Sequence, residues 1–463
     1  MKSNSIQAPS DGLRRGWAAQ IATPMGTCDF FHLLWQYRMA HISVPSEIGV
    51  LHKVIVHSPD EGISRISPRR AGELLFDDIV YLPQMQEEHR IFTDVLSCFL
   101  GSENVLEVEN IIREALDNSE EGKKEVLDMI MAFEELPSIY RKELDQMDHK
   151  TLARVLITGY MPENDTIYFD PVPNFIFTRD IAVVVNDHII ISKAAKEARF
   201  RENLLTRFGI WHNPIFDSMK EPGKIINLNI ADEFPPSRKG EVVSIEGGDM
   251  MILNQDYFLI GCSERSTMHA FHSLKQVLFD RDVVDNIVMV KIPQDRAYMH
   301  IDTIFTHINE DHIVGFKPIV TDGLSSYIEV YTKQGSLRKY ASIEQFMHAE
   351  INPEMQFIPA GSGESPYQER EQWTDACNLL AVRPGVALTY DRNVETAKTL
   401  KEYGYQFVHA TDFIKSCQQQ PDYASTLQQT IIALPSAELS RARGGAHCMS
   451  CPIMRDGFVQ KLS

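Results

Sequence analysis

One stretch near the end of the chain, residues 438–453, combines residue types that can do covalent chemistry. It reads Glu-Leu-Ser-Arg-Ala-Arg-Gly-Gly-Ala-His-Cys-Met-Ser-Cys-Pro-Ile and places Cys448 behind the glycine pair 444–445. Glycine gives the backbone left-handed or extended freedom, so this loop can bring its amides and Arg443 close to a small ligand. A free thiol is only about a few per cent thiolate at neutral pH, so a nucleophilic Cys448 needs a base or a cation beside it.

Cysteine spacing in this stretch is also compatible with metal or redox chemistry. Cys448 and Cys451 form a C-x-x-C pair with His447 beside it, which could be half of a zinc site or a redox pair. The chain has no second C-x-x-C pair and no H-x-x-x-H pair, so the spacing disfavours both. The other cysteines are Cys28, Cys98, Cys262, Cys377 and Cys417. A catalytic thiol and an inert loop cysteine both remain open, and we expect no metal site.

Candidate partners for the thiol lie in three short polar motifs. They are Asn174-Phe-Ile-Phe-Thr-Arg-Asp180, Glu246-Gly-Gly-Asp249 and His300-Ile-Asp302. Taken singly, an acid can cap or form a turn, and a histidine can be a satisfied core residue. Each motif, however, opens one of the hairpins predicted below, and this equivalent placement favours a shared site. His300 and Asp302, two apart on a predicted strand, should point to the same face.

The elements that must position these motifs repeat along the chain. Apolar runs and turn residues predict four hairpins, at 181–192, 249–261, 300–315 and 379–390. Helices are predicted after three of them, at 193–208, 266–279 and 393–403. An opening unit adds strands at 50–57 and 74–81 and a helix at 85–100. Five strand-pair modules of this kind predict an α/β fold with radial packing around a central axis.

The segment between the first and second modules has a different character. Residues 103–156 are acidic, poor in glycine and rich in Leu, Ile and Met at three-to-four spacing, which predicts a helical insertion. We predict that residues 1–45 form an N-terminal extension of unknown role. Residues 46–463 would then form the catalytic domain that carries the insertion.

The composition limits the class of protein. Of the 463 residues, 43% are hydrophobic and 24% are charged, which suits a globular, enzyme-sized chain. The net charge of −19 and the lack of a Lys/Arg-rich block argue against a nucleic-acid or anionic-membrane partner. Seven cysteines without a disulfide framework favour a reducing compartment, and no segment approaches 18 uninterrupted apolar residues. We therefore expect a cytoplasmic enzyme.

The candidate residues together specify the charge of a ligand. A thiol, a histidine and three or four carboxylates would repel one another when the site is empty, so they require a cation. A guanidinium fits best, because its planar fork binds two carboxylates and fixes the electrophilic carbon between them. Arg199, Arg265 and Arg443 stand where loops or helices start and suit the clamping of a carboxylate. The two halves together describe free arginine.

Five motifs, in order, resemble the successive signatures of the arginine deiminases, which belong to a wider group of guanidine-modifying enzymes. Besides the three polar motifs, they include Gly261-Cys-Ser-Glu-Arg265-Ser and Arg443-Gly-Gly-Ala-His-Cys448, and the likeness runs from about Val50 to Asp456. The resemblance implies a five-module, pseudo-symmetric α/β propeller of the pentein type. It also implies hydrolysis of free L-arginine to L-citrulline and ammonia, without a cofactor, by a homo-oligomer that is a dimer or tetramer.

The resemblance assigns catalytic roles residue by residue. Cys448 would attack the guanidinium carbon to give a covalent amidino-thioether. His300 would protonate the departing ammonia and then activate water. Asp180 and Asp302 would grip the guanidinium, and Glu246 would support His300 and the substrate nitrogens.

The resemblance also assigns residues to substrate binding. The positions that match those holding the amino-acid end are Asn174, Arg199, Arg265 and Arg443. Phe177 matches a ring that packs on the substrate stem. Asp249 would either serve the guanidinium or orient a neighbour.

Two positions depart from the family pattern. Ala446 stands where a third glycine is usual, which should stiffen the loop before Cys448. Arg70 stands near a usual asparagine, which affects how the α-amino group is met and therefore the selectivity for free arginine. Two alternative hypotheses remain. One is an arginine dihydrolase or amidinotransferase that resolves the same intermediate differently, and the other is a non-catalytic arginine-binding or metal-binding protein.

Overall fold

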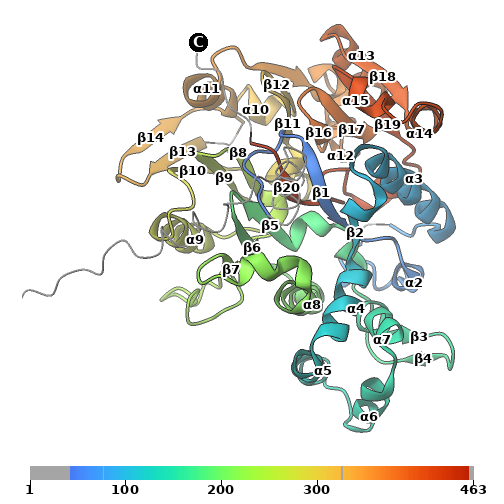
Figure 1. Cartoon of the computed structure of the whole chain (residues 1–463). Helices are drawn as coiled ribbons and strands as arrows, with labels where there is room; N and C mark the ends of the chain where they lie inside the picture. The colour runs from blue at the N-terminus through green and yellow to red at the C-terminus, as the bar shows by residue number, and fades with distance from the viewer. Residues whose placement is uncertain (1–41, 77, 325–326, 458–463) are drawn as a thin grey trace, which may run out of the picture. The chain divides into compact units, whose positions relative to one another are not determined.

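Small β-sheets alternate with helices along the described chain, which belongs to one unit, Ile42–Ser463 (Figure 1). The computed structural model describes residues 42–76, 78–324 and 327–457. Five sheets share one pattern, in which a middle strand pairs antiparallel with one neighbour and parallel with the other. The protein therefore has a mixed α/β fold, as the sequence predicts.

The five sheets follow one another along the chain, with two exceptions: the first also contains the last strand, and the third also contains two strands that come after the first two strands of the fourth. The first contains β20 (Cys451–Arg455), β1 (Leu51–Val56) and β2 (Val105–Glu107). The second contains β5 (Ala182–Val185), β6 (His188–Ile191) and β7 (Ile225–Asn227). The third contains β8 (Met250–Asn254), β9 (Tyr257–Cys262), β10 (Asn286–Lys291), β13 (Tyr327–Thr332) and β14 (Leu337–Tyr340). The fourth contains β11 (Phe305–Asn309), β12 (His312–Gly315) and β15 (Gln356–Pro359), and the fifth contains β16 (Leu380–Arg383), β17 (Val386–Tyr390), β19 (Thr430–Leu434) and β18 (Gln406–His409).

The four predicted hairpins are confirmed as antiparallel strand pairs. In the first, Val183 pairs with Ile190, and Asn186 makes the tight turn with a φ of 50°. Asparagine tolerates this left-handed conformation better than most residues. All residues of β5, β6 and β17 are buried, because neighbouring elements cover both faces of these short sheets.

Helices cover the outer sides of the sheets. They include α3 (Leu82–Leu100), α8 (Phe200–His212), α9 (Met268–Asp280), α13 (Val394–Glu402) and α14 (Ala410–Gln419). In Figure 1 the labels of α3, α8 and α9 lie outward of those of β1, β5 and β20. The helix predicted at 193–208 begins only at Phe200, because Glu197–Arg199 form a 3-10 turn that carries Arg199 into the interior.

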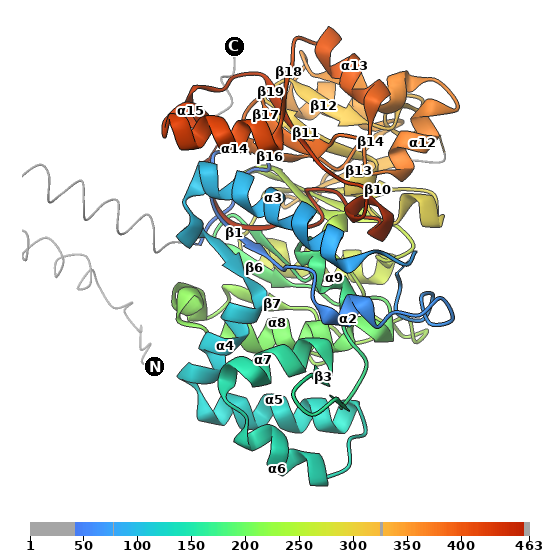
Figure 2. The same ribbon diagram turned by 90° about the vertical axis from the view of Figure 1, so that its right-hand side faces the viewer.

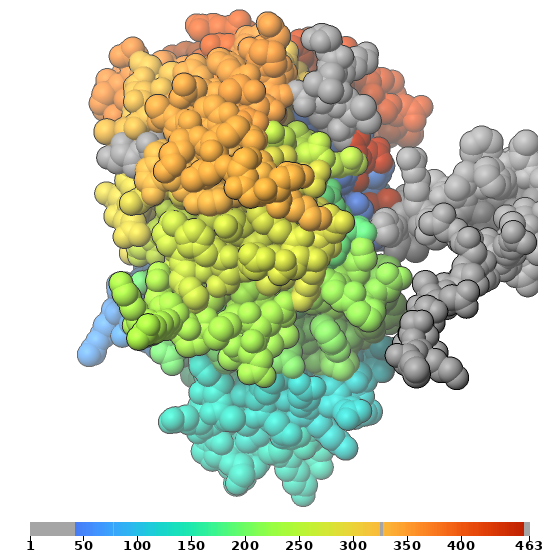
Figure 3. Space-filling model, turned by 90° about the vertical axis from the view of Figure 1, so that its left-hand side faces the viewer, coloured from blue at the N-terminus to red at the C-terminus, as the bar shows by residue number. Residues whose placement is uncertain are grey.

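Four helices occupy the segment predicted as a helical insertion. They are α4 (Val108–Asn118), α5 (Glu120–Phe133), α6 (Ile139–Gln146) and α7 (His149–Thr158). Ser119 and Asp148 cap the starts of α5 and α7 with side-chain oxygens, and Gly159 ends α7 in the left-handed conformation. These helices gather at one end of the unit (Figure 2), and Figure 3 shows their surface in cyan below the green and yellow modules.

The prediction of a strand at 74–81 is wrong for the residues of this segment that the structure describes. Residues 74–76 and 78–81 form turns and irregular backbone, and Leu75 has a φ of 60°. The antiparallel partner of β1 is β20 instead, which comes from the far end of the chain. Alternation of apolar residues is local information, so it cannot identify a partner almost four hundred residues away.

Residues 1–41 lie outside the described residues, and with them most of the predicted N-terminal extension. Within the described part, no helix is both long enough and apolar enough to cross a membrane.

Candidate active site

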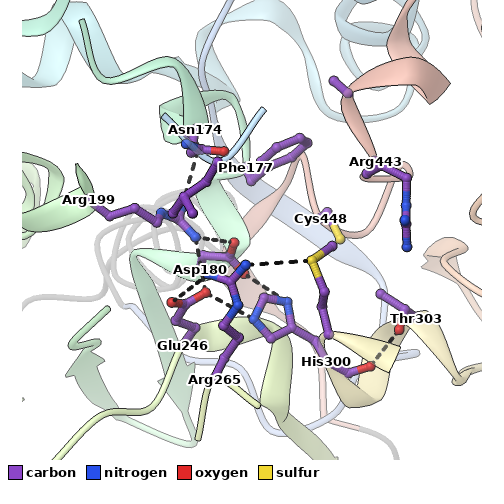
Figure 4. A pocket seen from close by; sticks show the side chains of 13 residues that line it. Asn174, Phe177, Asp180, Arg199, Glu246, Arg265, His300, Thr303, Arg443 and Cys448 are labelled. Carbon is purple, nitrogen blue, oxygen red and sulfur yellow. Dashed lines mark hydrogen bonds and ion pairs between the residues drawn. The ribbon is translucent and has the colours of Figure 1, made fainter. Parts of the chain in front are cut away.

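Short turns at the entrances of successive sheets carry the polar motifs. Thr178–Asp180 precede β5, Gly247–Asp249 precede β8, and Ile301–Thr303 precede β11, each as a single 3-10 turn. Each turn is hydrogen-bonded to the next one. Asp180 Oδ1 accepts from the Gly248 N–H at 3.2 Å, and Asp249 Oδ1 accepts from the Ile301 N–H at 2.9 Å. Residues far apart in sequence therefore meet at one point (Figure 4).

The prediction that His300 and Asp302 share one face of a strand is wrong. His300 is extended, but Ile301–Thr303 form a 3-10 turn, so the two side chains diverge. His300 lines the central cavity, whereas Asp302 is fully buried beside Cys448 and His447.

The cavity at the centre brings together nine of the eleven predicted site residues, leaving out only Asp249 and Asp302. Those that line it are Asn174, Phe177, Asp180, Arg199, Glu246, Arg265, His300, Arg443 and Cys448. Its volume is about 40 Å³, which holds a water molecule but not an amino acid. Some lining side chains must therefore move before any substrate of that size can enter.

His300 lies between two carboxylates. Its Nε2 is 3.0 Å from Glu246 Oε2, and its Nδ1 is 3.7 Å from Asp180 Oδ1. Burial by itself lowers the pKa of His300, but the charge of Asp180 and the hydrogen bond to Glu246 outweigh it and raise the pKa to about 10. Glu246 is buried too, yet Arg199 and His300 hold its pKa well below the usual range. The pair is therefore an imidazolium beside a carboxylate at neutral pH.

Arg199 supplies a resident cation to this cluster. Its Nη1 donates to Asp180 Oδ2 at 2.7 Å and to Glu246 Oε2 at 3.2 Å, and its Nε donates to Glu202 Oε2 at 2.9 Å. The protein itself thus offsets part of the negative charge of these carboxylates, which corrects the expectation that only a substrate cation relieves their repulsion. The predicted contact of Arg199 with a substrate carboxylate stays a prediction.

Cys448 lies among negative charges. Its Sγ is 3.4 Å from Asp302 Oδ2 and 3.1 Å from Asn378 Nδ2. Burial, followed by the charges of Asp302, Asp180 and Asp375, raises the pKa of the thiol well above its ordinary value. With these neighbours alone the sulfur is a protonated thiol, and a bound cation would favour the thiolate.

A chain of buried polar groups lies behind Cys448. His447 Nδ1 is 2.9 Å from Asp302 Oδ2, and His447 Nε2 is 3.3 Å from Glu47 Oε2. Glu47 Oε1 accepts from Arg179 Nη2 at 2.5 Å. Burial opposes the charge of Glu47, but Arg179 and His447 prevail and hold its pKa well below the usual range. This chain fixes Asp302 against Cys448.

Asp249 lies outside the cavity and binds its neighbours instead. Its Oδ2 accepts from the hydroxyls of Ser263 at 2.5 Å and Ser266 at 2.6 Å, and its Oδ1 accepts from the Ile301 N–H. Burial raises its pKa to about 6, against the effect of His300 and the two serines. Its position fits the predicted alternative that it orients a neighbour, here the turn that carries His300.

The glycine pair before Cys448 is required by close approach. A Cβ on Gly444 would lie 2.2 Å from the Phe177 ring, and one on Gly445 would lie 2.7 Å from the Asn378 carbonyl. The left-handed residue in this loop is Arg443, with a φ of 62°. Its guanidinium stacks 3.4 Å from the centre of the Trp373 ring, at the rim of the cavity. The loop is therefore packed tightly on both sides.

Two further predicted binding residues contact other protein groups. Asn174 Nδ2 donates to the Leu74 carbonyl at 2.7 Å, and Arg265 Nη1 is 3.8 Å from Glu246 Oε1. Arg70, one of the two positions that depart from the family pattern, does not line the cavity and pairs with Asp170 at 2.6 Å. Any effect of Arg70 on substrate selectivity would therefore be indirect.

One group among the described residues could hold a metal ion, namely Asp180, Glu246 and His300, whose ligand atoms lie within 4.8 Å of one another. Arg199 already contacts both carboxylates, so a metal ion would have to displace a guanidinium. The C-x-x-C pair forms no such group within the described chain, because Cys451 donates to the Ala182 carbonyl at 3.2 Å. Any cation that binds both carboxylates, whether a metal ion or an organic cation, would therefore compete with Arg199.

Two contacts of the site could not be found from the motifs. Asn378 contacts the sulfur of Cys448, and Trp373 stacks on Arg443, yet neither belongs to a charged cluster. A signal for Asn378 did exist, because it stands two residues before β16 as Asp180 stands two residues before β5. Comparing equivalent positions of all modules would have pointed to it.

Comparison with known proteins agrees with this geometry. A family model described as arginine deiminase matches residues 72–455. The arginine deiminase of Limosilactobacillus reuteri is 33% identical over 442 residues, which cover 90% of this chain and 98% of that protein. Those of Pediococcus pentosaceus and Listeria monocytogenes are 32% and 30% identical, with the same coverage. Among solved structures, an amidinotransferase from Microseira wollei in the saxitoxin pathway aligns at 12% identity and a TM-score of 0.48, over 91% of this chain and 99% of that chain, which is too distant to bear on the reaction.

Proposed function

This chain belongs to the arginine deiminase family, and we propose that it hydrolyses free L-arginine to L-citrulline and ammonia through a covalent amidino-cysteine. One observation carries the proposal: a thiol, an imidazolium and two carboxylates surround a single buried cavity. Carboxylates so placed favour a guanidinium, and the thiol is positioned to attack its carbon. Arginine carries both the guanidinium and the carboxylate that the arginines at this cavity can bind.

In the first half of the reaction the Cys448 thiolate attacks the guanidinium carbon, and a carbon–sulfur bond forms. The substrate cation promotes loss of the thiol proton to solvent, since it offsets the carboxylates that raise the thiol pKa. His300, which is protonated at neutral pH, then gives its proton to a terminal nitrogen. The bond between that nitrogen and the carbon breaks, ammonia leaves, and the amidino-thioether remains.

In the second half of the reaction the neutral His300 accepts a proton from a water molecule, and the water oxygen bonds to the amidino carbon. The carbon–sulfur bond then breaks, the sulfur leaves as a thiolate, and citrulline is released after losing one proton. Glu246, 3.0 Å from His300, holds the ring in place and stabilises its charged form. The sum is arginine plus water giving citrulline plus ammonium.

We assign substrate binding to the two sides of the cavity. Asp180 and Asp302 hold the guanidinium, which requires the cavity to widen as far as Asp302, because Asp302 does not line it in this structure. Phe177 packs on the stem, and Arg265 and Arg443 hold the carboxylate. This proposal is supported by the position of both arginines on the cavity wall. Arg199 faces Asp180 and Glu246, so it would contribute to substrate binding mainly by keeping those carboxylates ionised and aligned.

Because the cavity is smaller than an amino acid, we propose that the loop before Cys448 moves when the substrate enters. Arg443 would leave Trp373 in that movement. Ala446, which is buried, would limit the backbone change, so we propose a stiffer loop than a third glycine would give.

Three wider proposals rest on the sheet pattern, on charge and on family membership. The repeated sheet pattern, closed by pairing of β1 with β20, supports a five-module pseudo-symmetric propeller with a helical insertion after the first module. The net charge of −19 supports the absence of nucleic-acid and membrane partners. We also propose a cytoplasmic homo-oligomer that needs no cofactor.

Product analysis tests the proposal. The purified protein is incubated with L-arginine, and the products are identified by mass spectrometry, with Cys448→Ala as the matched control. Citrulline and ammonia from the parent alone are expected. Ornithine would assign the chain to the dihydrolase or amidinotransferase chemistry instead, and no product from the parent across mild pH would refute the proposed activity.

A further inference from the structure

We propose that Asn378 is a further catalytic residue, whose side-chain amide binds the sulfur of Cys448 and stabilises its thiolate form. This inference rests on the proposed function, because it gives the sulfur its role as nucleophile. Asn378 lies in the turn that precedes β16 and is fully buried. It belongs to none of the charged motifs in the sequence.

Three hydrogen bonds hold the Asn378 side chain. Its Nδ2 donates to the Asp302 carbonyl oxygen at 3.1 Å and to Cys448 Sγ at 3.1 Å, and its Oδ1 accepts from the Cys448 N–H at 2.9 Å. The amide therefore contacts the backbone and the sulfur of the nucleophile at once. It also connects Cys448 to Asp302, whose carboxylate contacts the same sulfur.

These contacts fix the orientation of the amide. The Asp302 carbonyl can only accept a hydrogen bond, and the Cys448 N–H can only donate one. A flipped amide would place oxygen against that carbonyl and nitrogen against that N–H, and both contacts would be repulsive. The nitrogen of Asn378 therefore faces the sulfur as a donor.

The donor opposes the charges that disfavour the thiolate. Asp302, Asp180 and Asp375 all act to keep the proton on Cys448. In the thiol form, sulfur can donate that proton to Asp302 Oδ2, while it accepts from Asn378. When the proton leaves, the hydrogen bond from Asn378 becomes charge-assisted and stronger, so it favours the anion.

The repeat explains why an amide is suited to this position. The turns before β5, β8 and β11 place the carboxylates Asp180, Asp249 and Asp302 around the centre. An aspartate in the equivalent turn before β16 would put another negative charge 3.1 Å from the sulfur. Asparagine has nearly the same shape, supplies the donor and adds no charge.

Asn378→Asp is the most direct test, because it keeps the shape and the acceptor for the Cys448 N–H. The readout is the pH dependence of alkylation of Cys448 by a haloalkyl amidine, which carries a positive charge like a guanidinium. We expect the profile to move to higher pH by about one to two units. We also expect kcat with arginine to fall about 10- to 100-fold, with KM changed less than about threefold.

Asn393→Asp provides the matched control. Asn393 is also buried, and its side chain donates to the Thr374 carbonyl and accepts from the Thr374 hydroxyl, so its amide is engaged away from the sulfur. Its alkylation profile should stay within about a few tenths of a pH unit of the parent. A similar shift in both variants would mean that any disturbance of this region moves the thiol.

Other outcomes are also decisive. An unchanged alkylation profile in Asn378→Asp, together with a raised KM, would show that Asn378 only holds the loop. If Asn378→Asp does not fold, Asn378→Ala should still shift the profile upward, and an unshifted profile would overturn the proposal. Alkylation needs no turnover, so the result stands even if the parent fails to convert arginine.

Discussion

Two buried histidines in this protein have almost the same electrostatic surroundings but different positions. His300 lies between Glu246 and Asp180, and His57 lies between Glu107, at 2.7 Å, and Asp60, at 3.1 Å. In each case burial lowers the pKa, and the two carboxylates outweigh it and raise it to about 10. A perturbed pKa therefore does not distinguish a catalytic histidine from a structural one.

Cavity size does not distinguish them either. The cavity beside His57 measures about 460 Å³, against about 40 Å³ beside His300. The two cavities differ in their lining residues. Cys448 lines the small cavity, whereas none of the described residues that line the large cavity is a cysteine. Only the small cavity places a thiol next to an imidazolium, and for this reason we assign the reaction to it.

The carboxylates also serve different ends. Asp60 accepts from the Gly62 N–H at the start of a short helix, and Glu107 accepts from the Ser58 N–H, so both brace the backbone around His57. Asp180 and Glu246 instead form ion pairs with Arg199 and face the cavity. The His57 group connects the end of β2 to the loop after β1, whereas the His300 group faces the cavity.

The largest expected effect is on turnover. His300→Asn should reduce kcat about 1000-fold, because it removes the group that we assign to move protons in both half-reactions. His57→Asn, the matched control, should leave kcat within about twofold, since His57 does not line the cavity that Cys448 lines. Steady-state citrulline formation measures both. Equal losses in the two variants would break the distinction between the sites.

The second-largest effect on activity is expected at Asp180. Asp180→Asn should lower kcat/KM about 100-fold, because it removes a charge that supports His300 and would hold the guanidinium. Both kcat and KM should change, as measured from initial rates over a range of arginine concentrations. Asp60→Asn, which removes the matching charge beside His57, is the control, and unchanged constants in Asp180→Asn would contradict the assigned role.

The effect at His57 should fall on stability. His57→Gln should lower the free energy of unfolding by about 2–3 kcal/mol, because it leaves two largely buried carboxylates without their cation. Urea denaturation followed by circular dichroism measures this, with activity as the second readout. A variant as stable as the parent would show that the ion pairs are not needed for the fold.

The smallest expected effect is a change with pH in the stability difference between the parent and His57→Gln. The pKa of His57 is raised from 6.5 to about 10 in the folded protein, so its contribution to stability is complete below pH 6.5 and is lost as the pH rises through 10. The stability gap between the parent and His57→Gln should narrow over this range. A gap that is constant or widens with pH would mean that the folded-state pKa is not raised.

The sequence was most informative where chemistry and local pattern coincide. Asp180, Glu246, His300 and Cys448 each lie in a short motif, and three of these motifs stand beside a hairpin that could be recognised from its apolar residues. Local pattern failed where a partner is distant. The pairing of β1 with β20 and the ion pairs of His57 with Glu107 join segments that no local rule connects.

Other features depend on burial, which the sequence does not display. The sequence does not indicate that Arg199 is buried among three carboxylates as their counter-ion, and its predicted contact with a substrate carboxylate stays a prediction. Asn378 carries no charge and therefore drew no attention, although its buried amide contacts the nucleophile. The glycine pair before Cys448 was explained by backbone freedom, whereas the packed ring of Phe177 and the Asn378 carbonyl require it.

The covalent step on Cys448 is the central claim, and trapping the adduct tests it most directly. The parent protein is mixed with arginine, quenched in acid during turnover, digested, and the peptide that contains Cys448 is measured by mass spectrometry. The account predicts that this peptide gains the mass of arginine less ammonia, and that the adduct is absent from Cys448→Ala. Continued citrulline production with no adduct on Cys448, or with an adduct on another cysteine, would contradict it.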